Sequence, residues 1–156
     1  MKHSEFTNLL IKGRIAEIIF EQMLKDSDKF TVLSFGYEKI LPEVARMQKT
    51  YENDETLQTI RRAPDFAVIT KRSKVVRLVE VKFRSKYDKT DIFNIAKDIH
   101  SSWNPCYLFV VTLKGFYYGK VENIVKNEGF IPPLSEETIP RQLQNQYLKV
   151  LKEYYK

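Results

Sequence analysis

Residues 64–83 read PDFAVITKRSKVVRLVEVKF, and this stretch decides how we expect the chain to fold. Two apolar runs, residues 66–70 and 75–83, are rich in β-branched and aromatic side chains. They flank the polar residues 71–74. Such a pattern predicts a β-hairpin with a four-residue loop.

The register of this hairpin is expected to bring two acidic side chains together. With the turn centred between Arg72 and Ser73, facing residues have numbers that sum to 145, so Asp65 faces Glu80. Like charges on facing residues destabilise a sheet unless a cation neutralises them. Mg²⁺ suits this position because it binds one or two carboxylates and keeps several waters. Lys82 projects from the same face as Glu80, since strand side chains alternate, and adds an ammonium to the group.

A purely structural alternative exists for the same strand. A register shifted by one residue would place the two acids on different faces of the sheet. Periodicity alone also fits an amphipathic strand whose solvent face carries Glu80, Lys82 and Arg84, with Val79, Val81 and Phe83 buried. That alternative leaves the facing carboxylates without an explanation.

Pro64-Asp65, followed after fourteen residues by Glu80-x-Lys82, resembles the signature of the PD-(D/E)XK nuclease superfamily. This superfamily includes restriction endonucleases and archaeal Holliday junction resolvases. The resemblance implies an α/β fold with a restriction endonuclease-like core, a central mixed β-sheet flanked by helices in the order α-β-β-β-α-β. It covers residues 4–113 approximately, within a single domain of residues 1–156 that carries a C-terminal extension over residues 114–156.

The family also places a glutamate on the first helix. We expect that helix to run over residues 4–24, with no proline inside it. Glu17 lies on a stripe that is otherwise apolar or small, formed with Leu10, Gly13, Phe20 and Leu24. Glu17 is therefore the candidate and Glu21, one turn further on, ranks second. The alternative for Glu17 is an ion pair with Arg14 on the helix surface.

The resemblance implies specific roles for these residues. Asp65, Glu80 and the carbonyl of Val81 would bind Mg²⁺ or Mn²⁺, with Glu17 assisting directly or through water. Lys82 would orient the attacking water or neutralise developing charge. The expected activity is hydrolysis of phosphodiester bonds, with DNA preferred over RNA, leaving a 5′-phosphate and a 3′-hydroxyl.

Positive charge is concentrated around these motifs. Between Arg61 and Lys89 there are ten basic and three acidic residues, a net charge of +7, whereas the whole chain carries +6. Nucleic-acid backbones are bound by such clusters. Basic residues in turns also serve solubility. That second role accounts less well for the residues that bracket the motifs, so the predicted nucleic-acid contacts are Arg61, Arg62, Arg84 and Lys86.

Two other functional classes fit part of this pattern. A non-catalytic module or subunit that only grips nucleic acid would keep the basic residues and the fold. Two opposed acids in the most basic region would, however, weaken its contact with phosphate. A domain that binds an acidic protein is the third alternative. No arrangement of His, Cys or Ser suggests nucleophilic catalysis.

Composition bounds the class of protein. At 156 residues and 43% hydrophobic residues, the chain suits one compact domain with one core. The single Cys106 excludes an intramolecular disulfide framework. The first residues lack an apolar signal core, and the longest apolar run, residues 106–111, is too short to span a bilayer. We therefore expect a cytoplasmic protein without membrane contact.

Before the hairpin, residues 30–35 form the first expected strand. A short helix after Pro42 and a polar stretch over residues 48–59 are expected next. This polar insertion is the segment we expect to be mobile.

After the hairpin, we expect a helix that begins with Thr90 as its N-cap. Residues 107–113 are almost continuously apolar and predict a strand in the middle of the sheet, followed by a strand near residues 115–119. A final helix begins near Pro140, and its apolar face either closes the core or forms a homodimer contact. The buried stripe of the first of these helices is Ile92, Ile95, Ala96, Ile99 and Trp103, and the face of the last is Leu143, Tyr147, Val150, Leu151 and Tyr154.

Overall fold

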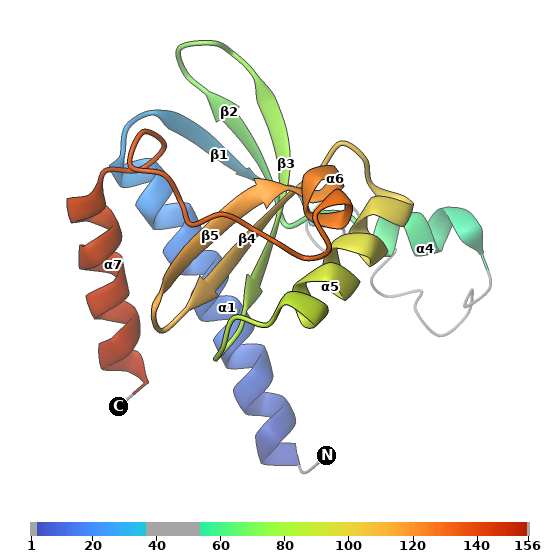
Figure 1. The fold of residues 1–156 in the computed structure, drawn as a ribbon, viewed down its shortest axis with the longest axis horizontal. Helices are drawn as coiled ribbons and strands as arrows, with labels where there is room; N and C mark the ends of the chain where they lie inside the picture. The colour runs from blue at the N-terminus through green and yellow to red at the C-terminus, as the bar shows by residue number, and fades with distance from the viewer. Residues whose placement is uncertain (1–2, 37–53, 156) are drawn as a thin grey trace.

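The computed structural model of the protein describes residues 3–36 and 54–155 (Figure 1). The short helix expected after Pro42 lies outside these residues. The described elements, in chain order, are α1 (His3–Asp26), β1 (Phe30–Ser34), α4 (Glu55–Arg61), β2 (Phe66–Thr70), β3 (Val76–Phe83), α5 (Lys89–Ser102), β4 (Tyr107–Thr112), β5 (Gly115–Lys120), α6 (Val121–Lys126) and α7 (Arg141–Tyr154).

The five described strands form one open sheet in the order β1-β2-β3-β4-β5. Strands β1, β2 and β3 are antiparallel neighbours, β3 and β4 are parallel, and β4 and β5 are antiparallel. The parallel step requires a crossover, which α5 supplies. The expectation of an α/β fold with a mixed sheet flanked by helices is therefore confirmed. Strand β4 was expected in the middle of the sheet; it is an interior strand paired on both sides, but β3 holds the middle position.

The hairpin has the expected register. Phe66 faces Val79 and Ile69 faces Val76, so facing residues have numbers that sum to 145. The loop is one residue longer than expected, because Val75 precedes the strand. Lys74 has a φ of 57°, a left-handed conformation that helps close the loop. Because β2 begins at Phe66, β3 extends past the start of its neighbour over residues 80–83.

Helices cover both faces of the sheet (Figure 1). Helices α1 and α7 lie on one face, where Phe20 and Met23 pack with Val79, Phe109 and Leu151. Helices α5 and α6 lie on the other face. There the buried residues are Ile92, Ala96, Cys106, Leu108, Val110, Val121, Ile124 and Ile131. The expected core stripe of α5 is confirmed, since its residues either belong to this cluster or pack against it.

One local expectation was wrong, and the structure adds detail to two others. Asp88, not Thr90, is the N-cap of α5, and its side chain accepts a hydrogen bond from Asp91 N at 2.8 Å. Of the polar stretch expected over residues 48–59, residues 48–53 lie outside the described residues. The rest forms the first part of helix α4, whose N-cap Asp54 accepts a hydrogen bond from Leu57 N at 2.8 Å. The apolar face of α7 is only half buried: Leu151 is inaccessible, but Tyr154 is 69% exposed.

The two halves of α1 have different surroundings. Phe20 and Leu24 are buried against the sheet, as expected. Leu10 lies on the same stripe but is 58% exposed, because the first turns of α1 project beyond the sheet (Figure 1). No helix within the described ranges has the length and apolar character needed to cross a membrane.

Candidate active site

Asp65 lies immediately before β2, at the point where the hairpin ladder ends. Its backbone carbonyl accepts a hydrogen bond from Phe35 N at 2.8 Å, which ties it to the end of β1. Its side-chain Oδ2 accepts a hydrogen bond from Val81 N at 2.8 Å. The carboxylate thus takes the place of a ladder partner for β3. Pro64 before it has no N–H and cannot extend the ladder.

The environment of Asp65 disfavours its charged form. Burial, followed by the negative charge of Glu80, raises the pKa of Asp65 to about 7. The hydrogen bond from Val81 N and the charge of Lys82 act in the opposite direction, and the charge of Glu17 raises the pKa further. The effects that disfavour the charged carboxylate of Asp65 therefore outweigh those that favour it. Perturbed groups of this kind are common at functional sites.

Glu80 and Lys82 project from one face of β3, as strand alternation predicts. Lys82 Nζ contacts Glu80 Oε1 at 2.5 Å, and the Glu80 side chain is only 15% exposed. Burial lowers the pKa of Lys82, but the carboxylates of Glu80 and Asp65 outweigh this effect, so that its pKa is raised overall. The ammonium is therefore charged at neutral pH. A fully solvated face on this strand does not fit the burial of Glu80.

A pocket of about 250 Å³ opens beside the end of β3. Glu17, Asp65 and Lys82 line it, so α1, β2 and β3 meet there. Glu80 does not line this pocket and instead lies behind its ion pair with Lys82. The remaining lining residues are Leu9, Lys12, Gly13, Val81, Phe83 and Arg84.

Glu17 has the ion pair of the structural alternative and also lies in the candidate site. It forms an ion pair with Arg14 at 2.8 Å on the surface of α1. It also lines the pocket that Asp65 lines, and its charge reaches the Asp65 carboxyl group. Glu21 pairs with Lys25 at 2.6 Å and does not line the pocket. Of the two helix acids, Glu17 is the one beside Asp65.

Asp65, Glu80 and the carbonyl of Val81 are the groups that could hold a divalent cation, but Glu80 does not line the pocket. In residues 3–36 and 54–155, no group of three or more His, Cys, Asp or Glu side chains is close enough to hold a metal ion. Val81 N points toward Asp65, and the N–H and C=O of one strand residue point to the same side. The carbonyl of Val81 thus faces the side where β2 has ended. A cation there would also relieve the raised pKa of Asp65.

The four predicted nucleic-acid contacts do not lie together. Arg84 lines the pocket and donates from Nε to Asp91 Oδ2 at 2.5 Å, near the start of α5. Arg62 donates to Ser102 Oγ at 3.2 Å, at the far end of the same helix. Arg61 is half-buried and Lys86 is exposed. Only Arg84 among them lines the pocket.

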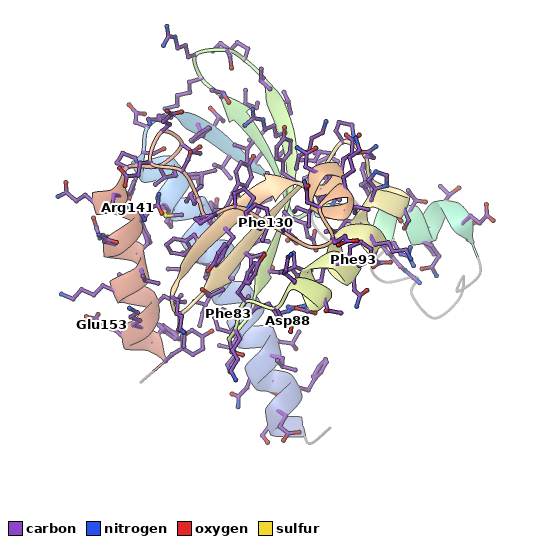
Figure 2. All side chains as sticks on the ribbon, in the orientation of Figure 1. Phe83, Asp88, Phe93, Phe130, Arg141 and Glu153 are labelled. Carbon is purple, nitrogen blue, oxygen red and sulfur yellow. The ribbon has the colours of Figure 1, made fainter. Side chains whose placement is uncertain are left out.

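Sequence reasoning missed Lys12 and the aromatic pair beside it. Lys12 lines the pocket, and its Nζ lies 5.9 Å from the ring centroid of Phe83 and 5.5 Å from that of Tyr155. Figure 2 shows Phe83 at the end of β3, beside α1. Tyr155 follows α7 and lies more than seventy residues after Phe83 in the sequence. No local pattern signals this contact, because it depends on how α7 docks.

No family model and no curated protein matches the chain. The function of the site is therefore inferred from its geometry and from the motif resemblance.

Proposed function

We propose that this protein is a metal-dependent nuclease of the PD-(D/E)XK type that hydrolyses phosphodiester bonds, most readily in DNA. The observation that carries the proposal is the placement of Asp65 and Lys82 in one pocket at the open end of the hairpin. The element order α1, β1, β2-β3 hairpin, α5, β4 supports a restriction endonuclease-like topology, with α4 as an addition between β1 and β2.

In this proposal, Asp65, Glu80 and the Val81 carbonyl hold Mg²⁺ or Mn²⁺, and Glu17 assists through a water molecule. The bound ion would make a water molecule more acidic and offset negative charge on the phosphate. The hydrogen bond from Val81 N fixes one oxygen of Asp65 and leaves the other free to bind. Glu17 adds negative charge to the pocket from the side of α1.

Lys82 is the chain's own electrostatic contribution to the reaction. Its ammonium lines the pocket and has three donors, of which one contacts Glu80. The remaining donors are available to orient the attacking water or to contact a phosphate oxygen. Charge stabilisation of this kind typically contributes roughly 10² to 10³ in rate.

The test is cleavage of plasmid, linear, branched and single-stranded DNA, and of RNA, with Mg²⁺, Mn²⁺ or EDTA. We expect cleavage that depends on the metal and is abolished in Asp65→Asn and Glu80→Gln. Asp28→Asn is the matched control, since Asp28 is exposed and paired with Lys71 in the turn region away from the pocket. Full activity in either site variant would remove that acid from the mechanism.

The second candidate function is a module that grips nucleic acid without cutting it. It is favoured by the ion pairs of Glu17 with Arg14 and of Glu80 with Lys82, which give both acids a structural partner. Binding in Ca²⁺ separates the two candidates, because a nuclease site binds DNA more tightly with this non-reactive ion and loses the effect in Asp65→Asn. Equal binding in Ca²⁺ and EDTA, with no cleavage of any substrate, would favour the module.

A further inference from the structure

Lys12 is held at the mouth of the candidate active site by two aromatic rings. Phe83 and Tyr155 stack with their ring centroids 5.1 Å apart and an interplanar angle of 12°. The Lys12 ammonium lies within 6 Å of both centroids, the range in which a cation is attracted to a ring. Three elements, α1, β3 and the end of α7, thus converge on one lysine.

The other two pocket cations already have hydrogen-bonded partners. Lys82 contacts Glu80, and Arg84 donates to Asp91 and to the carbonyl of Phe83. Within the described part of the chain, Lys12 has aromatic faces as its neighbours and no ion pair. Contact with aromatic rings leaves the N–H donors of an ammonium free for an anionic oxygen. Lys12 is thus the pocket cation most available to a ligand.

The chemistry of the pocket identifies the ligand as a phosphate of the nucleic-acid backbone. The rings of Phe83 and Tyr155 stack on each other, and the Lys12 ammonium lies near both, so the group with free donors in this part of the pocket is a cation. Asp65 and Glu17 line the same pocket and would repel a free anion unless cations balance them. Lys12 provides such a cation from the side of α1.

We infer that Lys12 binds a backbone phosphate next to the one that is cleaved, and that Phe83 and Tyr155 position its ammonium. The inference rests on the proposed function. It also assigns a role to the C-terminal extension, which the family resemblance leaves without one. Through Tyr155, α7 becomes part of the substrate-binding surface.

The test compares Lys12→Met, which removes the charge but keeps a long helix-forming side chain, with Lys12→Arg. Binding of a short fluorescent duplex and of a four-way junction with the same arms is measured in Ca²⁺ over a range of salt concentrations. Lys12→Met should weaken binding by roughly five- to tenfold and reduce the slope of log affinity against log salt by about 0.9. Lys12→Arg should restore both. Lys25→Met, on the same helix but away from the pocket, is the control and should bind like the parent.

Cleavage kinetics and Tyr155 variants test the positioning role. Lys12→Met should raise KM more than it lowers kcat, because the contact is made in the bound complex and in the transition state alike. Tyr155→Phe should behave like the parent, since the Tyr155 hydroxyl is buried and has no hydrogen-bond partner within the described residues. Tyr155→Leu should show the weaker binding of Lys12→Met.

The outcomes separate this inference from the proposed function. If the parent binds and cleaves nucleic acid, but Lys12→Met binds both probes with the parent's affinity and salt slope, the inference is wrong and the proposed function stands. If the parent neither binds nor cleaves any probe, both are wrong. Weaker binding in Lys12→Met and Tyr155→Leu, together with recovery in Lys12→Arg, supports the inference.

Discussion

At the scale of single residues, Asp65 has a structural role and an environment that disfavours its charge. Its carboxyl group accepts a hydrogen bond from Val81 N, which supports the end of β3, yet its pKa is raised to about 7. The buried position in which Asp65 accepts this hydrogen bond therefore also destabilises its ionised form. A bound cation would remove this conflict.

Stability without metal should decrease as pH rises. In the unfolded chain Asp65 ionises near its ordinary pKa of 3.8, whereas in the folded protein it ionises near 7. Between these values the folded state binds more protons than the unfolded state, so the free energy of unfolding falls with increasing pH. Each pKa unit corresponds to about 1.4 kcal/mol. Urea unfolding in EDTA should show higher stability at pH 5 than at pH 8.

The control for this measurement is Asp65→Asn, which cannot ionise. The stability of this variant relative to the parent should increase between pH 5 and pH 8, since the other titrating groups cancel in the comparison. A constant difference across that range would show that Asp65 is not the group responsible.

Lys82→Ala should separate binding from chemistry. If the ammonium serves the transition state, the variant should bind DNA in Ca²⁺ nearly as the parent does, while kcat falls by roughly 10² or more. Lys71→Ala is the matched control, because Lys71 is an exposed lysine paired with Asp28 in the turn region. A change in KM without a change in kcat would instead indicate that Lys82 only contacts a phosphate of the substrate.

How far residues can be predicted from sequence depends on the range of their contacts. The arrangement of Asp65, Glu80 and Lys82 is predictable because all three lie on one short hairpin, whose register follows from its turn. Lys12 was missed because its neighbours, Phe83 and Tyr155, come from β3 and from the end of α7. The ion pair between Glu80 and Lys82 depends on the side-chain rotamers of both residues, which the sequence pattern does not predict.

At the scale of secondary-structure elements, the strands were more predictable than the helix ends. The strands follow from apolar runs, and each expected strand end lies within one residue of the observed one. Two polar residues, Asp88 and Thr90, lie near the start of α5. Which of them is the N-cap depends on which side chain can accept a hydrogen bond from a free N–H of the first turn. Helix α4 was missed because its residues are polar, although Asp54 before them is a favourable N-cap.

Gly13 gives an element-scale test of where the substrate lies. It is a glycine inside α1, and a Cβ added there would meet no atom within 4 Å. Gly13→Ala should therefore stabilise the protein by about 0.5–1 kcal/mol. Because Gly13 lines the pocket, the added methyl group should also hinder a substrate that approaches α1 and raise KM. Thermal unfolding and cleavage kinetics measure the two effects.

Gly129→Ala is the contrasting variant. Gly129 has a φ of 91°, and its added Cβ would lie 2.0 Å from the carbonyl oxygen of Lys89, so the variant should be clearly destabilised. If Gly13→Ala were stabilising but cleaved DNA like the parent, the substrate would not approach this part of α1.

At the scale of the whole molecule, the C-terminal extension belongs to the same core as the rest. Leu134, Ile139 and Leu151 pack in one cluster with α1 and the sheet. The basic residues, in contrast, are split between two regions of the surface. Arg84 lines the pocket, while Arg62 lies where α4 meets α5. The sequence predicts the net positive charge of residues 61–89. How these basic residues are shared between the pocket and the α4–α5 contact depends on the packing of α4 and α5.

We therefore expect the basic residues to differ in their effect on DNA binding. Arg84→Gln should reduce the salt slope by about 0.9 and weaken binding of unrelated sequences equally, as expected for a phosphate contact. Arg62→Gln should have the smaller effect on both. Fluorescence anisotropy over a range of salt concentrations measures the slopes. Equal slopes for the two variants would instead indicate a nucleic-acid path that runs along α5.

The extension of β3 past the start of β2 leaves two backbone amides with different acceptors, and their hydrogen exchange can report on the site. The Arg84 amide is held by Val111 O in the neighbouring strand, whereas the Val81 amide is held by the Asp65 side chain. Amide hydrogen exchange at Val81 should therefore follow the protonation and occupancy of Asp65, while exchange at Arg84 follows the opening of the sheet. Deuterium uptake at these two amides would thus monitor the state of the site without any substrate.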